Sequence, residues 1–514
     1  MSPPPRDIYE HDVNFTALAL QDPAFAKKLK PNKQLDFSDP ESVLQLTKSL
    51  LHRDFEIDIE LPNDRLCPPV PNRFNYIIWL QDLVDSTSHD YRESYDPRRE
   101  VVGVDIGTGA SAIYPLLGCR QRPNWRFIAT EADEKSFDYA RRNVARNGLA
   151  DRIQVLKVED AGGKDGPLVP ESVLEKFERI DFVMTNPPFH SSQHSLLTSA
   201  SSKSRPPNSV CTGSPSEMIT PGGEVGFVTR LIHQSVSVQQ EKRTTRTKVQ
   251  WWSSMLGKLS SVGVVVERLR KAGCRNWAVK EFVHPGGKTR RWAVAWSFYG
   301  YRPASSVARG VGGRAVRAAS ASACANRGAV GAKKKKEGEE DGRHEEEVVV
   351  EGGLLPFPPE FEFEVQHAPG GVQEVGRRVD TEIGKLDLRW QWKPALGIGL
   401  GVAENGDCWS RKARRRKEQE MKMKELRLKE EDEEMRDPSE DDGDEDGDED
   451  KEPEFVFKIR LSRSSRSERG KEEKGKEVDQ GGVVVMLRWL QGQDHVVFES
   501  FCGWLNRKID LETR

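Results

Sequence analysis

Four residues, Asn186, Pro187, Pro188 and Phe189, stand directly after the short apolar run "RIDFVM". Two consecutive prolines cannot continue a buried strand, because proline has no backbone N–H to donate to a sheet. One reading is a turn without chemical importance, since Asn-Pro pairs open turns often. The alternative is a rigid loop beyond the end of a strand, which holds an amide oxygen, a carbonyl and an aromatic ring in fixed register.

A second stretch with chemical potential is "DIGTGASA", residues 105–112, which follows an apolar run. Gly107 and Gly109 allow the backbone to approach a ligand closely. The spacing also satisfies the G-x-G-x-x-A pattern of a dinucleotide-binding loop. Three features favour another cofactor: Asp105 before the first glycine, Glu131 at the end of the next expected strand, and the Asn-Pro-Pro-Phe run. Together they are similar to the Rossmann-like methyltransferases that use S-adenosylmethionine.

In enzymes of that kind the glycine loop lies against the methionine and ribose parts of the cofactor, and a carboxylate holds the ribose hydroxyls. The resemblance therefore gives Glu131 the ribose role. The alternative for Glu131 is a surface acid at the start of a helix, in "EADEKS". Its place beside the glycine loop favours the cofactor role.

The same resemblance gives the Asn-Pro-Pro-Phe loop a chemical purpose. The amino group of a nucleobase is a poor nucleophile, because its lone pair is delocalised into the ring. The Asn186 side-chain oxygen and the Pro187 carbonyl would accept both N–H groups and localise that pair toward the incoming methyl group. Phe189 offers a stacking face worth about 1–3 kcal/mol. Such a loop would catalyse transfer by positioning and by electrostatic preorganisation. The target base must be unpaired or flipped out to reach it.

Alternating strands and helices must position these loops. The apolar patterns predict strands in "VVGVDIG", "WRFIATEAD", "RIQVLKV", "RIDFVMT" and "KVQWWSSM", with at least one of Trp251 and Trp252 in the core. They predict helices in "ASAIYPLLG", "EKSFDYARRNVARNG", "GGEVGFVTRLIHQSV" and "SVGVVVERLRKAG". This order indicates an α/β class with a parallel sheet covered on both faces. The pair "NWAVKEFV" and "RWAVAWSF" has no helix between its members and predicts an antiparallel hairpin at one edge. Ligands of such sheets bind beyond the carboxyl ends of the strands, where the strand order reverses.

The whole chain is too polar for one compact globule. Of its 514 residues 31% are charged and 36% hydrophobic, with a mean hydropathy of −0.68. We expect an N-terminal RNA-binding module (1–95), a methyltransferase domain (96–302), a disordered linker (303–350) and an α+β RNA-binding region (351–514) with a charged disordered insertion at about 411–453. In the last region, the segment after residue 482 is expected to form a strand, a turn at Gly492, a second strand and a helix.

Other sequence features concern the compartment. The seven cysteines form no C-x-x-C pair, which favours reduced thiols over a disulfide or zinc framework. The first residues have no apolar core for a signal peptide, and no run approaches about 18 apolar residues. The basic runs Lys333 to Lys336 and "RKARRRK" predict nuclear import. We therefore expect the protein in the nucleus, with the cytoplasm as a further location.

Longer motifs define the resemblance further. "LCPPVPNRFNYIIWLQDL", "DIGTGASAIYPLLG", "NPPFH", "PGGEVGFVTRLIHQS" and "TRRWAVAWSF" together resemble the methyltransferase-like protein 16 family of RNA adenine-N6 methyltransferases, over residues 8–300. The resemblance implies S-adenosylmethionine as cofactor and a structured RNA as partner, with U6 small nuclear RNA the usual eukaryotic substrate. It implies cofactor contacts at Arg73, Gly107, Ser111, Glu131 and Asn186, no metal, and a catalytic loop of Asn186, Pro187, Pro188 and Phe189.

The sequence departs from the animal members of that family in two places. His190 stands where they tend to have a second aromatic residue, and it is similar to bacterial relatives that act on large-subunit ribosomal RNA. "VEDAGGKDGPLVPE" replaces the animal loop over the cofactor pocket, so a contact there, such as Lys164, has no firm counterpart.

The sequence is compatible with other functions. Loops of this type also occur in enzymes that methylate glutamine side chains. A ribosomal RNA adenine-N6 methyltransferase and a catalytically silent RNA-binding protein are further readings, and the intact motifs argue against silence.

Phosphate contacts require basic side chains. The candidates, each of which has an ordinary surface charge as its alternative, are Lys27, Lys28, Lys30, Lys33, Arg53, Lys203, Arg205, Lys242, Arg243, Arg246, Lys288, Arg290 and Arg291.

Overall fold

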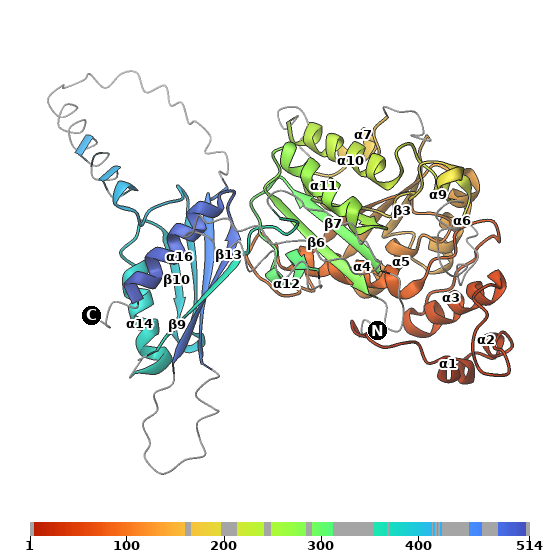
Figure 1. Cartoon of the computed structure of the whole chain (residues 1–514), viewed down its shortest axis with the longest axis horizontal. Coiled ribbons are helices and arrows are strands. Elements are labelled where there is room, and N and C mark those ends of the chain that lie inside the picture. The colour runs from red at the N-terminus through yellow and green to blue at the C-terminus, as the bar shows by residue number, and fades with distance from the viewer. Residues whose placement is uncertain are drawn as a thin grey trace, which may run out of the picture. The chain divides into compact units, whose positions relative to one another are not determined.

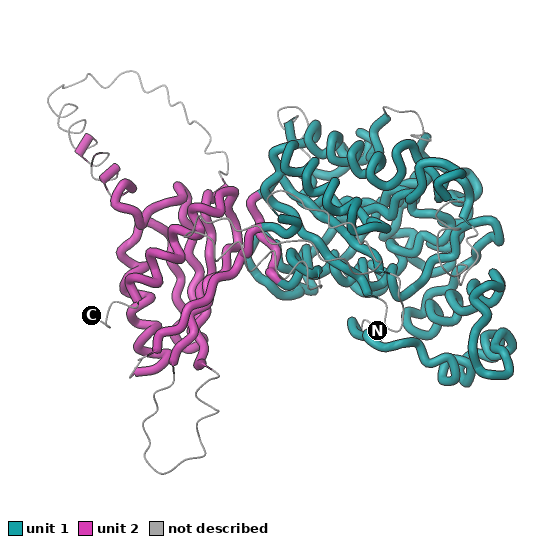
Figure 2. Tube along the Cα trace, viewed as in Figure 1, with its two compact units in different colours: residues 1–299, 306–356 teal, residues 300–305, 357–514 magenta. Residues whose placement is uncertain are grey.

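The computed structural model describes residues 5–159, 166–196, 213–240, 248–283, 290–311, 353–366, 370–413, 452–464 and 482–509, with residues 415, 416, 419, 422 and 423. The chain divides into two compact units (Figure 2). Unit 1 comprises residues 1–299 and 306–356, and unit 2 comprises residues 300–305 and 357–514. Within the described helices, none combines the length and apolarity needed to cross a membrane.

Unit 1 is built on an eight-stranded sheet in the order β3-β2-β1-β4-β5-β7-β6-β8. Its strands are β1 (Val101–Ile106), β2 (Trp125–Glu131), β3 (Ile153–Lys157), β4 (Arg179–Thr185), β5 (Lys248–Leu256), β6 (Asn276–Val283), β7 (Arg290–Ser297) and β8 (Arg309–Gly310). The first five pair in parallel, as the sequence predicts. The core prediction is also confirmed, because Trp251 and Trp252 are both buried.

The strand order reverses between β1 and β4, and this reversal determines where the helices lie. From β1 the chain steps to β2 and β3 through α5 (Ile113–Gln121) and α6 (Glu134–Arg146). From β4 it steps the opposite way to β5 through α10 (Gly223–Gln240) and onward through α11 (Leu259–Lys271). Because such crossovers are right-handed, the two sets of helices cover opposite faces of the sheet (Figure 1). The predicted α/β architecture, a parallel sheet covered by helices on both faces, is therefore confirmed.

The remaining helices of unit 1 are short or come before the sheet. They are α1 (Phe15–Gln21), α2 (Pro23–Ala26), α3 (Pro40–Phe55), α4 (Val70–Asp85), α7 (Glu171–Leu174), α9 (Pro215–Met218) and α12 (Ser305–Ala308). Aspartate side chains cap α2 and α3, where Asp22 and Asp39 each accept two backbone N–H groups. Most side chains of α4 are buried, because this helix packs between α5 and the sheet.

The antiparallel end of the sheet agrees with the predicted hairpin and adds one strand. β7 pairs with both β5 and β6, and the short β8 pairs with β6 on the outer side. β8 and α12 belong to the first residues of the expected linker, and Val307 and Ala308 are buried. The rest of that linker, residues 312–350, lies outside the described residues.

Unit 2 contains a five-stranded antiparallel sheet in the order β10-β11-β12-β13-β9, with two helices against one face (Figure 1). Its elements are β9 (Glu360–Val365), α14 (Gly371–Ile383), β10 (Arg389–Lys393), the 3-10 helix η1 (Pro394–Leu396), β11 (Ile398–Ala403), β12 (Phe455–Arg463), β13 (Val483–Gln491) and α16 (His495–Ile509). Aromatic rings fill the space between helices and sheet, with the rings of Phe457 and Phe501 at a centroid distance of 4.1 Å. This is the α+β region that the sequence predicts.

One expectation for unit 2 is wrong. Residues 495–509 form the single helix α16, where a strand and then a helix were expected after Gly492. The run "HVVFES" resembles a strand because of its valines, but Phe498, Phe501, Cys502, Leu505 and Ile509 recur at helical spacing and are all buried. Most of the expected charged insertion, including residues 424–451, lies outside the described part of the chain.

Candidate active site

The two motifs meet at the point where the strand order reverses. Ile106, the last residue of β1, pairs with Thr185, the last residue of β4. The Thr185 hydroxyl donates a hydrogen bond to the Ile106 carbonyl at 3.1 Å. The glycine loop and the Asn-Pro-Pro-Phe loop therefore leave the sheet from adjacent positions. In sheets of this kind, ligands bind at this edge.

The glycine loop has the backbone shape that its sequence predicts. Gly107 and Gly109 have φ angles of +69° and +67°, which residues with a Cβ rarely adopt. A Cβ placed on Gly107 would meet no described atom within 4 Å, so the backbone faces open space. Ser111 is buried at the end of this loop. The loop forms a cradle with room for a ligand against its backbone.

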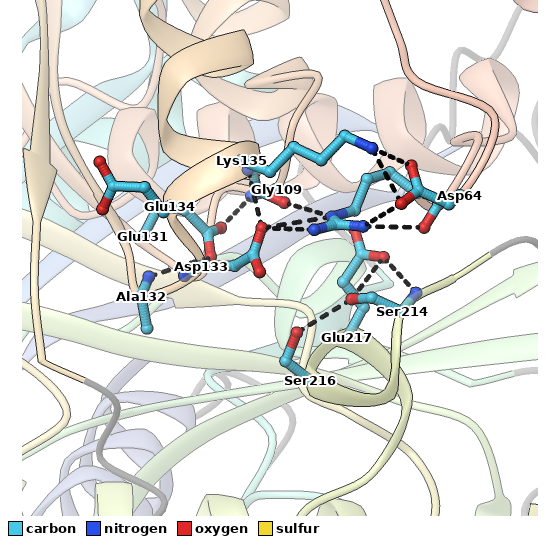
Figure 3. A network of polar contacts seen from close by, with 12 residues as sticks. Asp64, Gly109, Glu131, Ala132, Asp133, Glu134, Lys135, Ser214, Ser216 and Glu217 are labelled. Atoms are coloured by element: carbon cyan, nitrogen blue, oxygen red, sulfur yellow. Dashed lines mark hydrogen bonds and ion pairs between the residues drawn. The ribbon is translucent and has the colours of Figure 1, made fainter.

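Glu131 lies at the rim of the cradle. Its carboxylate accepts hydrogen bonds from the backbone N–H of Gly109 at 2.8 Å and from those of Ala132 and Asp133 at 2.9 Å (Figure 3). Burial raises the pKa of Glu131, and these three donors partly offset that effect. Glu131 is thus a buried acceptor fixed to the glycine loop, rather than an exposed acid at the start of a helix.

Asp105 has an unusual environment for a carboxyl group. Its side chain is buried, and neither carboxylate oxygen meets hydrogen-bond geometry with any described protein group. Burial raises the pKa of Asp105 to about 7, with Glu131 adding to the rise. The Thr108 hydroxyl and Arg73 lower that pKa in part. Buried oxygens of this kind are normally paired, which indicates a place for a ligand or water.

Arg73 comes from α4 and reaches the same place. Its guanidinium is buried and donates to the Tyr114 hydroxyl at 2.9 Å, with the Met255 sulfur at 3.6 Å. The Arg73 guanidinium carbon lies 5.5 Å from the centre of the Tyr114 ring. A cationic group is therefore held beside the carboxyl of Asp105.

The Asn-Pro-Pro-Phe loop has an open acceptor. The Asn186 side-chain oxygen is buried and has no hydrogen-bond partner within the described parts of the chain. Pro187 is buried, and Pro188 and Phe189 are half-buried. After the loop, His190 donates to the Met218 carbonyl at 3.0 Å and accepts from the Thr220 N–H at 2.9 Å. This backbone pairing fixes the end of the loop to the segment that follows α9.

A polar network beside the cradle joins three distant segments (Figure 3). One Glu217 oxygen accepts from the N–H and hydroxyl of Ser214 and from the Leu66 N–H. The other lies 3.8 Å from where a Cβ on Gly109 would be. Arg65 bonds to Asp133, which caps α6. Sequence reasoning missed Glu217, although "SPSE" has the S-x-x-E pattern of a capping box that starts a helix.

Several of the basic candidates are less available for phosphate than the sequence suggests. Lys28, Lys30, Arg53 and Arg290 form ion pairs with Glu41, Asp36, Asp54 and Glu281 at 2.6–3.0 Å. Arg291 lies beside Phe189, and burial lowers its pKa. Six candidates lie outside the described residues, as does Lys164: Lys203, Arg205, Lys242, Arg243, Arg246 and Lys288.

The arrangement can therefore hold a ligand between an open glycine backbone, an acceptor carboxylate and unpaired buried oxygens. Arg73 of α4 and Glu131 of β2 both act on the carboxyl of Asp105 in β1. Gly107, Ser111 and Asn186 lie in the two loops that leave the adjacent ends of β1 and β4. The donor set fits the cofactor that the sequence predicts. A sulfonium cofactor with a carboxylate, an ammonium group and ribose hydroxyls needs both cationic and anionic partners.

Comparison with known proteins identifies relatives of this part of the chain. A family model described as "RNA methyltransferase" matches residues 2–300. The chain is 38% identical over 278 residues to the U6 small nuclear RNA (adenine-(43)-N(6))-methyltransferase of Schizosaccharomyces pombe, which covers 54% of this chain and 66% of that protein. It is 41% identical over 293 residues to the human RNA N(6)-adenosine-methyltransferase METTL16, which covers 56% of this chain and 48% of that protein. The matches span less than two thirds of these relatives' own lengths.

Among solved structures, the human METTL16 catalytic domain in complex with MAT2A 3'UTR hairpin 1 aligns with a TM-score of 0.49 and 38% identity. That alignment covers 58% of this chain and 96% of that structure. The N-terminal domain of human METTL16 in complex with SAH aligns with a TM-score of 0.44 and 36% identity, over 58% of this chain and all of that structure.

Proposed function

The chain belongs to the RNA methyltransferase family, and from that premise we propose that it transfers a methyl group from S-adenosylmethionine to N6 of adenosine in a structured RNA. The relatives at 38–41% identity are named as adenine-N6 or adenosine-N6 methyltransferases of RNA, which supports this reaction. Methylation of protein glutamine, an alternative for this loop type, receives no support from those relatives.

The observation that carries the proposal is the unpaired, buried side-chain oxygen of Asn186 beside the open glycine cradle. An exocyclic amine has two N–H groups, and the Asn186 oxygen and the Pro187 carbonyl would each accept one. When both N–H groups are held in this way, the nitrogen lone pair is localised and points toward the incoming methyl group. Because both acceptors belong to a loop held between β4 and the backbone pairs of His190, little reorganisation is needed at the moment of reaction.

The cofactor supplies a methyl group on a positively charged sulfonium, already activated for transfer. On this chain, Glu131 would accept from the ribose hydroxyls, and Arg73 would bind the carboxylate of the methionine part. The backbone at Gly107 and Ser111 would lie along the cofactor, and Asn186 would border its methyl group. The face of Phe189 would carry the adenine, which must leave its stack to enter the site.

U6 small nuclear RNA is the substrate that we propose first, because the fission yeast relative is named for it. Large-subunit ribosomal RNA is the alternative, on the strength of His190 and its resemblance to the bacterial loop. A catalytically silent RNA-binding protein is the third reading, and the complete set of site residues counts against it.

We also propose that unit 2 is a second RNA-binding module. In an antiparallel sheet, alternate side chains face opposite sides. Lys393 and Arg460 lie in one cross-strand row through Ile398, and Lys458 lies in the next row, on the face away from the side chains that pack against the helices. The basic runs at 333–336 and 411–417 support a nuclear location, with cytoplasm as a further site.

Mapping of N6-methyladenosine tests these readings together. RNA from cells with the protein, without it, and with an Asn186→Ala variant is sequenced for N6-methyladenosine. Loss of a U6 site in the last two samples is the expected result. Loss of a large-subunit ribosomal site instead would select the alternative substrate, and an unchanged map would favour the silent RNA-binding reading.

A further inference from the structure

Phe189 rests on a platform made by three segments outside its own loop. A Cβ on Gly223 would lie 3.1 Å from the Phe189 carbonyl oxygen. A Cβ on Gly257, directly after β5, would lie 3.2 Å from the Cδ1 atom of the Phe189 ring. The Arg291 guanidinium carbon lies 5.6 Å from the centre of that ring. The position of the ring therefore depends on where Gly223 and Gly257 are held.

Glu224 holds these segments together. It lies in the first turn of α10, and its side chain is buried, with a relative exposure of 5%. One carboxylate oxygen accepts from the Gly257 N–H at 2.6 Å, and the other accepts from the Ser261 hydroxyl of α11 at 2.5 Å. The carboxylate thus joins the start of α10 to the turn between β5 and α11.

Gly257 lies between Glu224 and Phe189. The same Cβ on Gly257 that would crowd Phe189 would also lie 3.2 Å from the Glu224 carboxylate. Gly257 is therefore in contact with the acid on one side and with the ring on the other. Any shift of the Gly257 backbone moves the surface against which the ring packs.

Glu224 does not have the geometry of an acid–base group. Both of its oxygens are engaged by protein donors. Burial raises its pKa, and Ser261, Gly257, Lys258 and Arg291 act in the opposite direction. The Arg291 guanidinium, which lies beside the Phe189 ring, therefore also interacts electrostatically with the Glu224 carboxylate. Hydrogen bonds to a buried carboxylate are stronger than those between neutral groups, which suits a fixed brace.

We propose that Glu224 is a positioning residue for methyl transfer, which holds Gly257 and thereby the Phe189 ring at the angle that presents the adenine amine. This inference rests on the proposed function and assigns Glu224 no contact with cofactor or RNA. Substitution of Glu224 should affect the chemical step, because a small displacement of the target adenine lowers the rate of methyl transfer by as much as about 10²-fold.

The test compares four variants of the full-length chain: Glu224→Ala, Glu224→Gln, Ser261→Ala and Glu374→Ala. The last removes a first-turn glutamate of α14 in unit 2 and is the matched control. Single-turnover methylation of U6 small nuclear RNA gives the rate, calorimetry the cofactor affinity, and RNA titration the RNA affinity. Thermal unfolding and hydrogen exchange of peptides from unit 1 report on folding.

We expect Glu224→Ala to lower the single-turnover rate on the order of 10²-fold, with both affinities within about threefold of wild type. Glu224→Gln should recover most of the rate, because its amide oxygen still accepts from Gly257 and its NH2 group can donate to the Ser261 hydroxyl. Ser261→Ala leaves the hydrogen bond from the Gly257 N–H to Glu224 intact, so it should lower the rate less than Glu224→Ala does. Glu374→Ala should match wild type.

Gly257→Ala provides a second route to the same step, because it pushes on the ring directly. It should lower the rate as Glu224→Ala does. The double variant, with both substitutions, should lose rate by a smaller factor than the product of the factors for the two single variants.

Two results would overturn the positioning role: an active wild type with an equally active Glu224→Ala variant, or a rate loss in Glu224→Ala accompanied by equal losses of affinity and unit 1 folding. A wild-type chain that methylates no adenosine would instead overturn the proposed function itself.

Discussion

Asn186 and Asp105 carry buried oxygen atoms that no described protein group satisfies. An unpaired buried polar atom costs about 1–3 kcal/mol, so a fold keeps one only where another requirement outweighs that cost. Asp105 lies near the end of β1 and Asn186 follows the adjacent β4, at the point where the strand order reverses. One of these atoms, the Asn186 side-chain oxygen, is the acceptor that the proposed reaction needs.

Asn186→Ala tests the acceptor role. Loss of a preorganised hydrogen-bond partner at the reacting amine should lower methyl transfer on the order of 10²-fold or more. Cofactor and RNA binding should stay within a few-fold, because most of their contacts lie elsewhere. Single-turnover kinetics with radiolabelled cofactor measure the loss. A variant that retains more than about a tenth of the wild-type rate would contradict the role.

Asp105 makes stability depend on pH. Its pKa in the folded chain, about 7, exceeds the ordinary 3.8, so the folded state binds a proton that the unfolded chain releases. Its contribution to stability is complete below about pH 3.8 and is lost as the pH rises through about 7. Between pH 5 and 7 the free energy of unfolding should fall relative to Asp105→Asn by up to about 1.4 kcal/mol per pH unit.

Urea unfolding of the cofactor-free full chain measures this effect, with hydrogen exchange of β1 and β4 peptides as the probe for unit 1. Parallel stability curves for wild type and Asp105→Asn across that pH range would show that Asp105 is not held neutral by burial.

At the scale of elements, the strand and helix patterns of unit 1 were predictable because each has one period and a clear end. The glycine and proline motifs also mark strand ends, so their meeting at one edge follows from the α/β order. The run 495–509 was not predictable in the same way. Its valines favour a strand locally, and they compete with the helical spacing of Phe498, Phe501 and Leu505, which pack against the sheet.

The contribution of Glu217 and Glu224 to the site could not be read from the sequence either. Each acts on a residue distant in the chain: Glu217 on Leu66, and Glu224 on Gly257. Spacing along the chain predicts neighbours on one helix face or one strand, and these contacts depend on tertiary packing.

Glu217→Ala should loosen the element that contains α9. Three hydrogen bonds are lost, to the N–H and hydroxyl of Ser214 and to the Leu66 N–H, each worth about 0.5–1.5 kcal/mol. Hydrogen exchange in residues 213–220 should accelerate on the order of tenfold or more. Ser216→Ala, which leaves all three bonds intact, is the control. Equal exchange in Glu217→Ala and wild type would mean that this network does not fix the segment.

At the scale of the molecule, the end of unit 1 differs from the boundary that composition suggests. The Val307 carbonyl accepts from the Trp79 indole at 3.0 Å, and the Leu354 carbonyl accepts from the Trp277 indole at 3.2 Å. A chain cut at residue 302 would lose these contacts and β8. The composition of residues 303–350 predicts a linker, because a short buried piece such as Val307 and Ala308 hardly changes the average composition of the segment.

A chain ending at residue 356 should therefore keep the fold of unit 1 and the rate at saturating RNA. It should bind RNA more weakly, because two RNA-contacting modules on one chain gain affinity through effective concentration. RNA titrations at two salt concentrations compare it with the full chain, and the full chain should have the steeper salt dependence. Equal affinity and equal slope would show that unit 2 is not an RNA module.

The most direct test of the whole account is the product of the purified chain. Full-length wild type and Asn186→Ala are incubated with S-adenosylmethionine and either U6 small nuclear RNA or large-subunit ribosomal RNA, and the RNA is digested to nucleosides for mass spectrometry. The account predicts N6-methyladenosine with wild type and a loss on the order of 10²-fold or more with the variant. Absence of N6-methyladenosine from U6 and ribosomal RNA alike, with a folded wild-type chain that binds the cofactor, would contradict it.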